Sequence, residues 1–211
     1  DNSGDIHVVW QDRTPGAWGS DIEIMYASYT NATGWSKAIV ISDGIKGVYW
    51  NDGDSHFPDI AVDNSGDIHV VWHDTTDGAW GTDYEIMYAS YTNATGWSNA
   101  TVISDGIKGL YWNDGNSYSP DIAVDDSGDI HVVWYDFTSG GWGTDAEIMY
   151  TSYTEADGWS IAIVISDDDT LWNDGNSYNT EIAVDDLSAV HVVWEDDTNG
   201  AWGSDWEIMH V

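Results

Sequence analysis

The sequence has no cysteine and only four basic residues, and both shortages exclude whole classes of function. Without cysteine there is no disulfide, no thiolate catalysis and no cysteine-based zinc or iron–sulfur site. The 38 acidic residues give a formal net charge of -34. This charge argues against nucleic acid and anionic membrane surfaces as partners, because both need Lys and Arg to neutralise phosphate. Cations are the expected partners.

Long apolar runs are also missing. No stretch of about 18 apolar residues is present, so we expect no membrane insertion, and no basic-then-apolar leader stands at the N-terminus. We find no helical periodicity longer than a turn. The 211 residues therefore predict one all-β domain, 1–211.

The sequence does contain one unit that is repeated four times. An (Ile/Val)-His-Val-Val-Trp run ends at Trp10, Trp72, Trp134 and Trp194. A fixed spacing of about 62 residues is typical of repeat architectures. We place the repeats at 1–57, 58–119, 120–179 and 180–211.

Each complete repeat predicts four antiparallel strands, which in the second repeat are 58–63, 68–72, 85–91 and 97–104. Four such strands are typical of a β-propeller blade. We expect a β-propeller whose first blade lacks its first strand and whose last blade lacks its fourth. Three explanations stay open: an excerpt of a longer propeller, a four-bladed ring without those strands, or a homo-oligomer or filament joined through exposed strand edges.

The repeat pattern resembles the bacterial neuraminidase repeat, or sialidase-like β-propeller, family. That family's Asp-box spans seven residues from Ser to Trp in the turn before the fourth strand, and the pairs Ser28/Trp35, Ser90/Trp97 and Ser152/Trp159 keep this spacing. The rest of the box is lost, with Thr30, Ala32 and Gly34 at its Asp, Gly and Thr positions. The resemblance implies the propeller fold. Sialidases clamp a substrate carboxylate with three arginines, whereas this chain has only Arg13, so we expect no sialidase activity.

Two sets of loops present tryptophan beside polar residues, and the strand order places both sets on one face of the disc. An indole ring stacks on sugar C–H groups while amides bind hydroxyls, although the same residues could pack the loops together. The candidate ligand-binding residues are Trp50, Asn51, Trp112, Asn113, Trp172 and Asn173, with Trp18, Trp80, Trp142 and Trp202 on the loops between the second and third strands.

Asp-rich loops favour calcium, because carboxylate and carbonyl oxygens are its ligands. The alternative is that these aspartates bind loop amides. The candidate metal ligands are Asp52, Asp114 and Asp174, together with Asp12, Asp74, Asp136 and Asp196 after the second strands.

The repeated histidines His7, His69, His131 and His191 are interpreted as structural, bonded between blades, with Glu23, Glu85, Glu147 and Glu207 as partners or strand-end charges. Sequons at Asn31, Asn93 and Asn99 are candidate glycosylation sites, and they favour a location outside the cell.

Catalysis needs groups in unlike environments, whereas the acids of this chain occur as near-identical copies. The sequence therefore favours a non-enzymatic extracellular or cell-surface propeller that acts as a structural or adhesive assembly module. The alternative is a calcium-assisted, lectin-like propeller with glycans as partners. A glycoside-processing enzyme is the third hypothesis.

Overall fold

The computed structural model describes residues 1–43, 51–105, 113–167 and 173–211. Within these ranges every regular element is a strand. The described residues include no helix, and so none long and apolar enough to cross a membrane. The all-β prediction is confirmed.

The strands form four antiparallel sheets, one for each repeat. Sheet 1 contains β1 (Ile6–Asp12), β2 (Glu23–Thr30), β3 (Gly34–Trp35) and β4 (Ile39–Val40). Sheet 2 contains β5 (Ser55–Val62), β6 (Ile68–Asp74), β7 (Glu85–Thr92), β8 (Gly96–Trp97) and β9 (Thr101–Val102). Sheet 3 contains β10 (Ser117–Val124), β11 (Ile130–Asp136), β12 (Glu147–Thr154), β13 (Gly158–Trp159) and β14 (Ile163–Val164). Sheet 4 contains β15 (Ser177–Val184), β16 (Val190–Asp196) and β17 (Glu207–His210).

In the first three repeats the predicted fourth strand is broken in two, as β3 and β4, β8 and β9, and β13 and β14. In sheet 2, Tyr91 pairs with Trp97 of β8, whereas Tyr88 pairs with Thr101 of β9. Three residues, 98–100, therefore face only two residues of β7, 89–90. The extra residue interrupts the ladder, which is why a single strand over 97–104 does not form.

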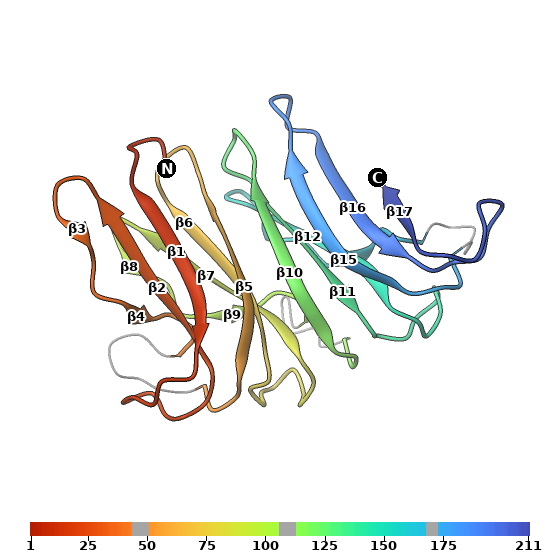
Figure 1. Ribbon diagram of the computed structural model, residues 1–211, viewed down its shortest axis with the longest axis horizontal. Coiled ribbons are helices and arrows are strands. Elements are labelled where there is room, and N and C mark those ends of the chain that lie inside the picture. Colours follow the sequence, from red (N-terminus) through yellow and green to blue (C-terminus); the bar gives the residue numbers. More distant parts are fainter. Residues whose placement is uncertain (44–50, 106–112, 168–172) are drawn as a thin grey trace.

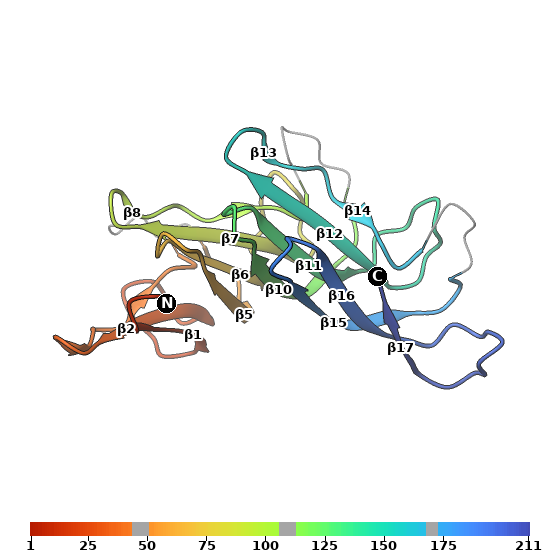
Figure 2. The same cartoon turned by 90° about the horizontal axis from the view of Figure 1, so that it is seen from above.

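The sheets pack face to face, and both faces of the middle sheets are buried. On β6, Val70 and Trp72 pack against sheet 1, while Val71 between them packs against sheet 3. Successive side chains of a strand point to opposite faces, so the apolar Val-Val-Trp run supplies both cores. Figures 1 and 2 show the sheets following one another along the molecule, with sheet 1 and sheet 4 at opposite ends.

This arrangement is propeller-like. The strands β5, β10 and β15 are its inner strands, and β10 lies between β5 and β15 (Figure 1). The number of blades in a closed ring stays a prediction.

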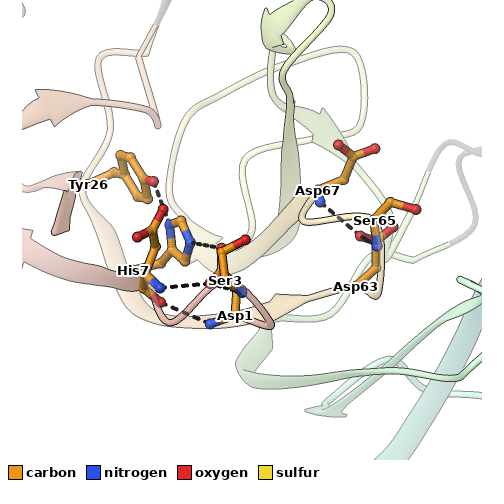
Figure 3. A network of polar contacts seen from close by, with 8 residues as sticks. Asp1, Ser3, His7, Tyr26, Asp63, Ser65 and Asp67 are labelled. Carbon is orange, nitrogen blue, oxygen red and sulfur yellow. Dashed lines mark hydrogen bonds and ion pairs between the residues drawn. The ribbon is translucent and has the colours of Figure 1, made fainter. Parts of the chain in front are cut away.

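The repeated histidine is tied within its own sheet. His7 Nδ1 lies 2.8 Å from the Tyr26 hydroxyl, and its Nε2 lies 3.4 Å from Asp1 Oδ2 (Figure 3). The partner of this histidine is therefore a tyrosine rather than Glu23, whose Oε2 accepts the Ser42 hydroxyl at 2.5 Å. The interpretation of a bond between sheets was wrong, because strands β1 and β2 place His7 and Tyr26 on the same face.

Candidate functional site

The three inner strands share an irregularity near their first residues. Pairing of β5 with β6 shifts register between His56 and Asp59, so Phe57 and Pro58 together lie opposite Trp72. β10 and β15 shift at the equivalent places, and the bulged residues Phe57, Ser119 and Asn179 have φ of 49°, 48° and 51°. Positive φ is strained for residues other than glycine, and such bulges are common beside functional sites.

The bulges line a cavity of about 580 Å³, a size typical of small-ligand sites. Its lining residues are Phe57, Pro58, Asp59, Ser119, Pro120, Asp121, Asn179, Thr180, Glu181 and Glu195. Four of these residues carry a carboxyl group and none is Lys or Arg. We call this space the inner-strand cavity.

Two of the carboxyl groups lie against each other. Asp59 Oδ2 accepts the Ile122 backbone N–H at 3.0 Å, and Asp121 Oδ2 accepts that of Ile182 at 2.7 Å. These bonds tie each inner strand to the next sheet. The Ile122 N–H also lies 3.1 Å from Asp121 Oδ1, so the two carboxyl groups share this donor and lie close together.

The protonation of Asp121 follows from this placement. Burial raises the pKa of Asp121 to about 8, and the hydrogen bond and negative charge of Asp59 add to the rise. Two carboxyl groups in contact cannot both ionise without a large cost. At neutral pH Asp121 therefore carries a proton, and the cavity combines a protonated carboxyl group with the exposed carboxyl group of Glu181.

Each bulged residue makes a hydrogen bond with the side chain that follows the Trp in the second strand of a repeat. Ser119 N–H donates to His73 Nδ1 at 3.3 Å, and Phe57 N–H donates to Gln11 Oε1 at 3.0 Å. Burial lowers the pKa of His73 to about 4, so its ring is neutral and Nδ1 can accept. In sheet 4, Asn179 Nδ2 donates to Glu195 Oε2 at 3.0 Å.

The repeats share Asp59 and Asp121 at one position of the cavity, but they differ at the bulges and at the residues that hold them. The residue after the second-strand Trp is Gln11, His73, Tyr135 or Glu195, and the bulged residue is Phe57, Ser119 or Asn179. Near-identical repeats therefore still produce unlike environments, which the symmetry argument from the sequence overlooked. Listing the positions where the repeats diverge would have pointed to the bulged residues and to Glu181, which stands where the other repeats have Asp59 and Asp121.

The predicted ligand residues Asn51, Asn113 and Asn173 lie in buried polar networks, at 4%, 2% and 2% exposure. In sheet 2, Asp74 Oδ2 accepts Asn51 Nδ2 at 2.8 Å, the Ser55 hydroxyl at 2.6 Å and Trp72 Nε1 at 3.0 Å. Its Oδ1 accepts the Thr76 N–H at 2.8 Å. Asp136 and Asp196 make the same four kinds of bond. In sheet 1, Asp12 accepts Trp10 Nε1 and the Thr14 N–H.

The tryptophans of the loops after the second strands fold back on their own loops. Trp80 Nε1 donates to Thr76 O at 3.2 Å, and a Cβ at Gly78 would lie 2.3 Å from the indole ring. Trp18, Trp142 and Trp202 make the equivalent bond at 3.3, 3.0 and 3.3 Å. None of these four residues lines the inner-strand cavity. Trp50, Trp112 and Trp172 lie outside the described residues.

The remaining predicted site residues are on the surface. Asp52, Asp114 and Asp174 are exposed, as are the sequon residues Asn31, Asn93 and Asn99. In the described ranges no three His, Asp or Glu side chains are grouped so that they could hold a metal ion. Calcium binding, the ligand roles and glycosylation stay predictions.

No protein-family model matches the chain, and no curated protein does. Several solved structures share its fold. A PL25 ulvan lyase bound to -[GlcA(1-4)Rha3S]- superposes with a TM-score of 0.60 at 12% identity, over 100% of this chain and 53% of the lyase. An endo-arabinase from Bacteroides thetaiotaomicron gives a TM-score of 0.54 at 10% identity, over 99% and 71%. An N-acetylgalactosamine deacetylase from F. plautii gives 0.51 at 12% identity, over 99% and 69%.

These similarities establish a propeller-like fold, and the chain spans about half the length of the lyase. The three similar structures are all carbohydrate-processing enzymes. The prediction of a non-enzymatic structural or adhesive module is wrong on this finding. The sialidase-like resemblance holds only at the level of the propeller-like fold, since no family model supports it.

Proposed function

We propose that this chain carries a glycoside hydrolase site for neutral glycans, built on the inner strands of a β-propeller. The observation that carries the proposal is the Asp59–Asp121 pair in a cavity that also holds Glu181. Hydrolysis of a glycosidic bond uses two carboxyl groups, one protonated and one ionised. Environments that separate the protonation states of neighbouring carboxyl groups are how enzymes assign these roles.

Asp121 is the proposed general acid. Its raised pKa keeps it protonated at neutral pH, so it can donate a proton to the leaving-group oxygen. Asp59 is a positioning residue, since its charge and hydrogen bond favour the protonated form of Asp121. Glu181 is the proposed second carboxylate, because it is exposed to the cavity and can meet water or the sugar.

The charge of the site favours a neutral substrate. Four carboxyl groups line the cavity, and the whole chain carries a net charge of -34. A uronate or sulfated sugar would meet repulsion without a cationic group in the lining to offset it. The exposed ring of Phe57, 60% accessible, offers a face for stacking on a neutral sugar. An extracellular location fits a polysaccharide substrate and the three sequons.

The test is release of reducing ends from a panel of neutral polysaccharides, with a uronate polymer as the charged comparison. We expect turnover of a neutral glycan that falls about 10²–10⁴-fold in Asp121→Asn. A comparable loss is expected in Glu181→Gln. Asn and Gln keep an acceptor oxygen, so the backbone contact of residue 121 can persist.

The matched control is Asp126→Asn, an exposed change in the turn between β10 and β11 that should leave turnover unchanged. Unsaturated, ultraviolet-absorbing products from the uronate polymer would show a lyase instead. Turnover that survives both Asp121→Asn and Glu181→Gln would place the chemistry elsewhere.

A further inference from the structure

The inner-strand cavity is lined by a threonine whose hydroxyl group has no partner among the described residues. Thr180, on β15, is 5% exposed. Its Oγ1 is buried and forms no hydrogen bond with any described residue. Of the hydroxyl groups in the described ranges, this one alone is both buried and unpaired. A buried polar group without a partner costs free energy, so its presence needs an explanation.

The other inner strands show that the bulge does not need this hydroxyl. Pro58 and Pro120 occupy the equivalent place, directly after the bulged residue of β5 and of β10. Proline has no polar side-chain atom, yet both strands form the same bulge with the same positive φ. The backbone of the bulge therefore does not account for the buried hydroxyl of Thr180.

The neighbours of Thr180 in the chain fix its place beside the reacting groups. Asn179 and Glu181 both line the cavity. Asp121 Oδ2 accepts the Ile182 N–H at 2.7 Å, which holds the proposed general acid two residues along the strand from Thr180. A threonine side chain has three staggered positions about its Cα–Cβ bond, and rotation between them moves Oγ1 to the place of the methyl group or of the Cβ hydrogen.

We propose that Thr180 determines the specificity of the hydrolase site, by turning its hydroxyl group into the cavity to form a hydrogen bond with a hydroxyl of a neutral sugar. This inference rests on the proposed function, since it places the sugar beside Asp121. A hydroxyl donates to a sugar oxygen or accepts from a sugar O–H, whereas an ionised carboxylate only accepts. The bond pairs a group that the free protein leaves unpaired, and sites built to bind a substrate hydroxyl are strongly selective for it.

The test compares Thr180→Val, which has the same shape without the hydroxyl, with Thr180→Ser, which keeps the hydroxyl. The probes are oligosaccharides of glucose, mannose, galactose, xylose and arabinose. On the probe that the wild type hydrolyses best, kcat/KM should fall about tenfold in Thr180→Val, the effect of one lost hydrogen bond. Thr180→Ser should restore most of this loss. The change should appear in KM with kcat nearly unchanged, since a bond to a hydroxyl away from the cleaved linkage is present before and during the reaction.

The melting temperature separates this role from a structural one. Thr180→Val removes a buried hydroxyl that has no partner, so it should melt at the same temperature as the wild type or higher. Thr144→Val is the matched control, because Thr144 is exposed and does not line the cavity, and it should change neither KM nor the melting temperature. A lower melting temperature in Thr180→Val, with KM unchanged, would give the hydroxyl a structural role and overturn the inference.

Calorimetric titration of the same oligosaccharides into the wild type and Thr180→Val distinguishes this inference from the proposed function. Hydrolysis that is equally efficient in both proteins overturns the role of Thr180 alone. Binding that is about tenfold weaker in Thr180→Val, without turnover by the wild type, supports the role of Thr180 and overturns the hydrolase proposal. A wild type that neither binds nor hydrolyses these sugars overturns both.

Discussion

Three buried glutamates, Glu23, Glu85 and Glu147, are the first residues of β2, β7 and β12. Glu85 is 1% exposed and its Oε2 accepts the Ser104 hydroxyl at 2.5 Å. Its Oε1 and the Oδ2 of Asp83 are both buried without a hydrogen-bond partner. Burial raises the pKa of Glu85 to about 9, and the charges of Asp83 and Asp105 add to the rise. A proton retained on Glu85 removes its negative charge, and this explains how Glu85 can lie buried close to Asp83 and Asp105.

Stability should therefore fall as the solution becomes alkaline. Between an ordinary value of 4.5 and about 9, folded Glu85 holds a proton that the unfolded chain has released. Its contribution is present below the unfolded pKa and is lost as pH rises through the folded pKa. Glu23 and Glu147, whose pKa values burial raises to about 8, act in the same direction.

Glu85→Gln tests this directly, because Gln has the shape of the protonated acid and no charge to release. Relative to the wild type, we expect its melting temperature to be similar near pH 5 and higher near pH 9. Glu155→Gln, in an exposed turn, is the control and should follow the wild type. A Glu85→Gln curve parallel to that of the wild type at all pH values would rule out the retained proton.

Asp136 also contributes to stability, because its buried carboxylate accepts four hydrogen bonds. The donors are Asn113, Ser117, Trp134 and Thr138. A buried donor left without an acceptor costs about 1–3 kcal/mol. Asp136→Ala should therefore lower the free energy of unfolding by more than about 3 kcal/mol. Asp114→Ala, on the exposed part of the adjoining loop, should change it by less than about 0.5 kcal/mol.

Denaturant unfolding measures the free energy of unfolding of both variants. Repeating the measurement with calcium and with a chelator distinguishes calcium binding by these loops from hydrogen bonding within them. A calcium-dependent midpoint that Asp114→Ala abolishes would support the predicted metal site. A small effect of Asp136→Ala would contradict the structural role of the network.

At the scale of the elements, the inner-strand bulges connect backbone strain to the cavity. Ser119 holds φ of 48° where its N–H meets His73. A β-branched residue is strained at this φ and glycine is not. Ser119→Val should lose about 1–3 kcal/mol of stability. Ser119→Gly should stay close to the wild type, as measured by thermal melting, and an equal loss in both variants would show that the φ value is not what matters.

The sequence predicted the elements that depend on local pattern. The His-Val-Val-Trp run alternates and repeats, so its strands could be placed from spacing alone. The break between β8 and β9 could not, since it depends on how residues 98–100 match residues 89–90 on another strand. The bulge at Phe57 likewise depends on its register against Trp72, which no local pattern records.

At the scale of the whole molecule, the candidate site exists only where three sheets meet. Asp59 and Asp121 are 62 residues apart in the numbering, and their contact follows from the packing of β5 beside β10. The loop aromatic and amide residues attracted attention in the sequence because they repeat. Asp59 and Asp121 repeat as well, whereas Glu181 and the residues that hold the bulges, Gln11, His73 and Glu195, stand at positions where the repeats diverge.

The most direct test of the hydrolase account is the pH dependence of kcat/KM on a neutral glycan. Since Asp121 must be protonated to act as the acid, activity should fall as pH rises through about 8. Asp59→Asn removes the neighbouring negative charge, so it should move this fall to lower pH. A fall in activity that stays at the same pH in Asp59→Asn, or a glycan turnover that does not decline above pH 8, would contradict the account.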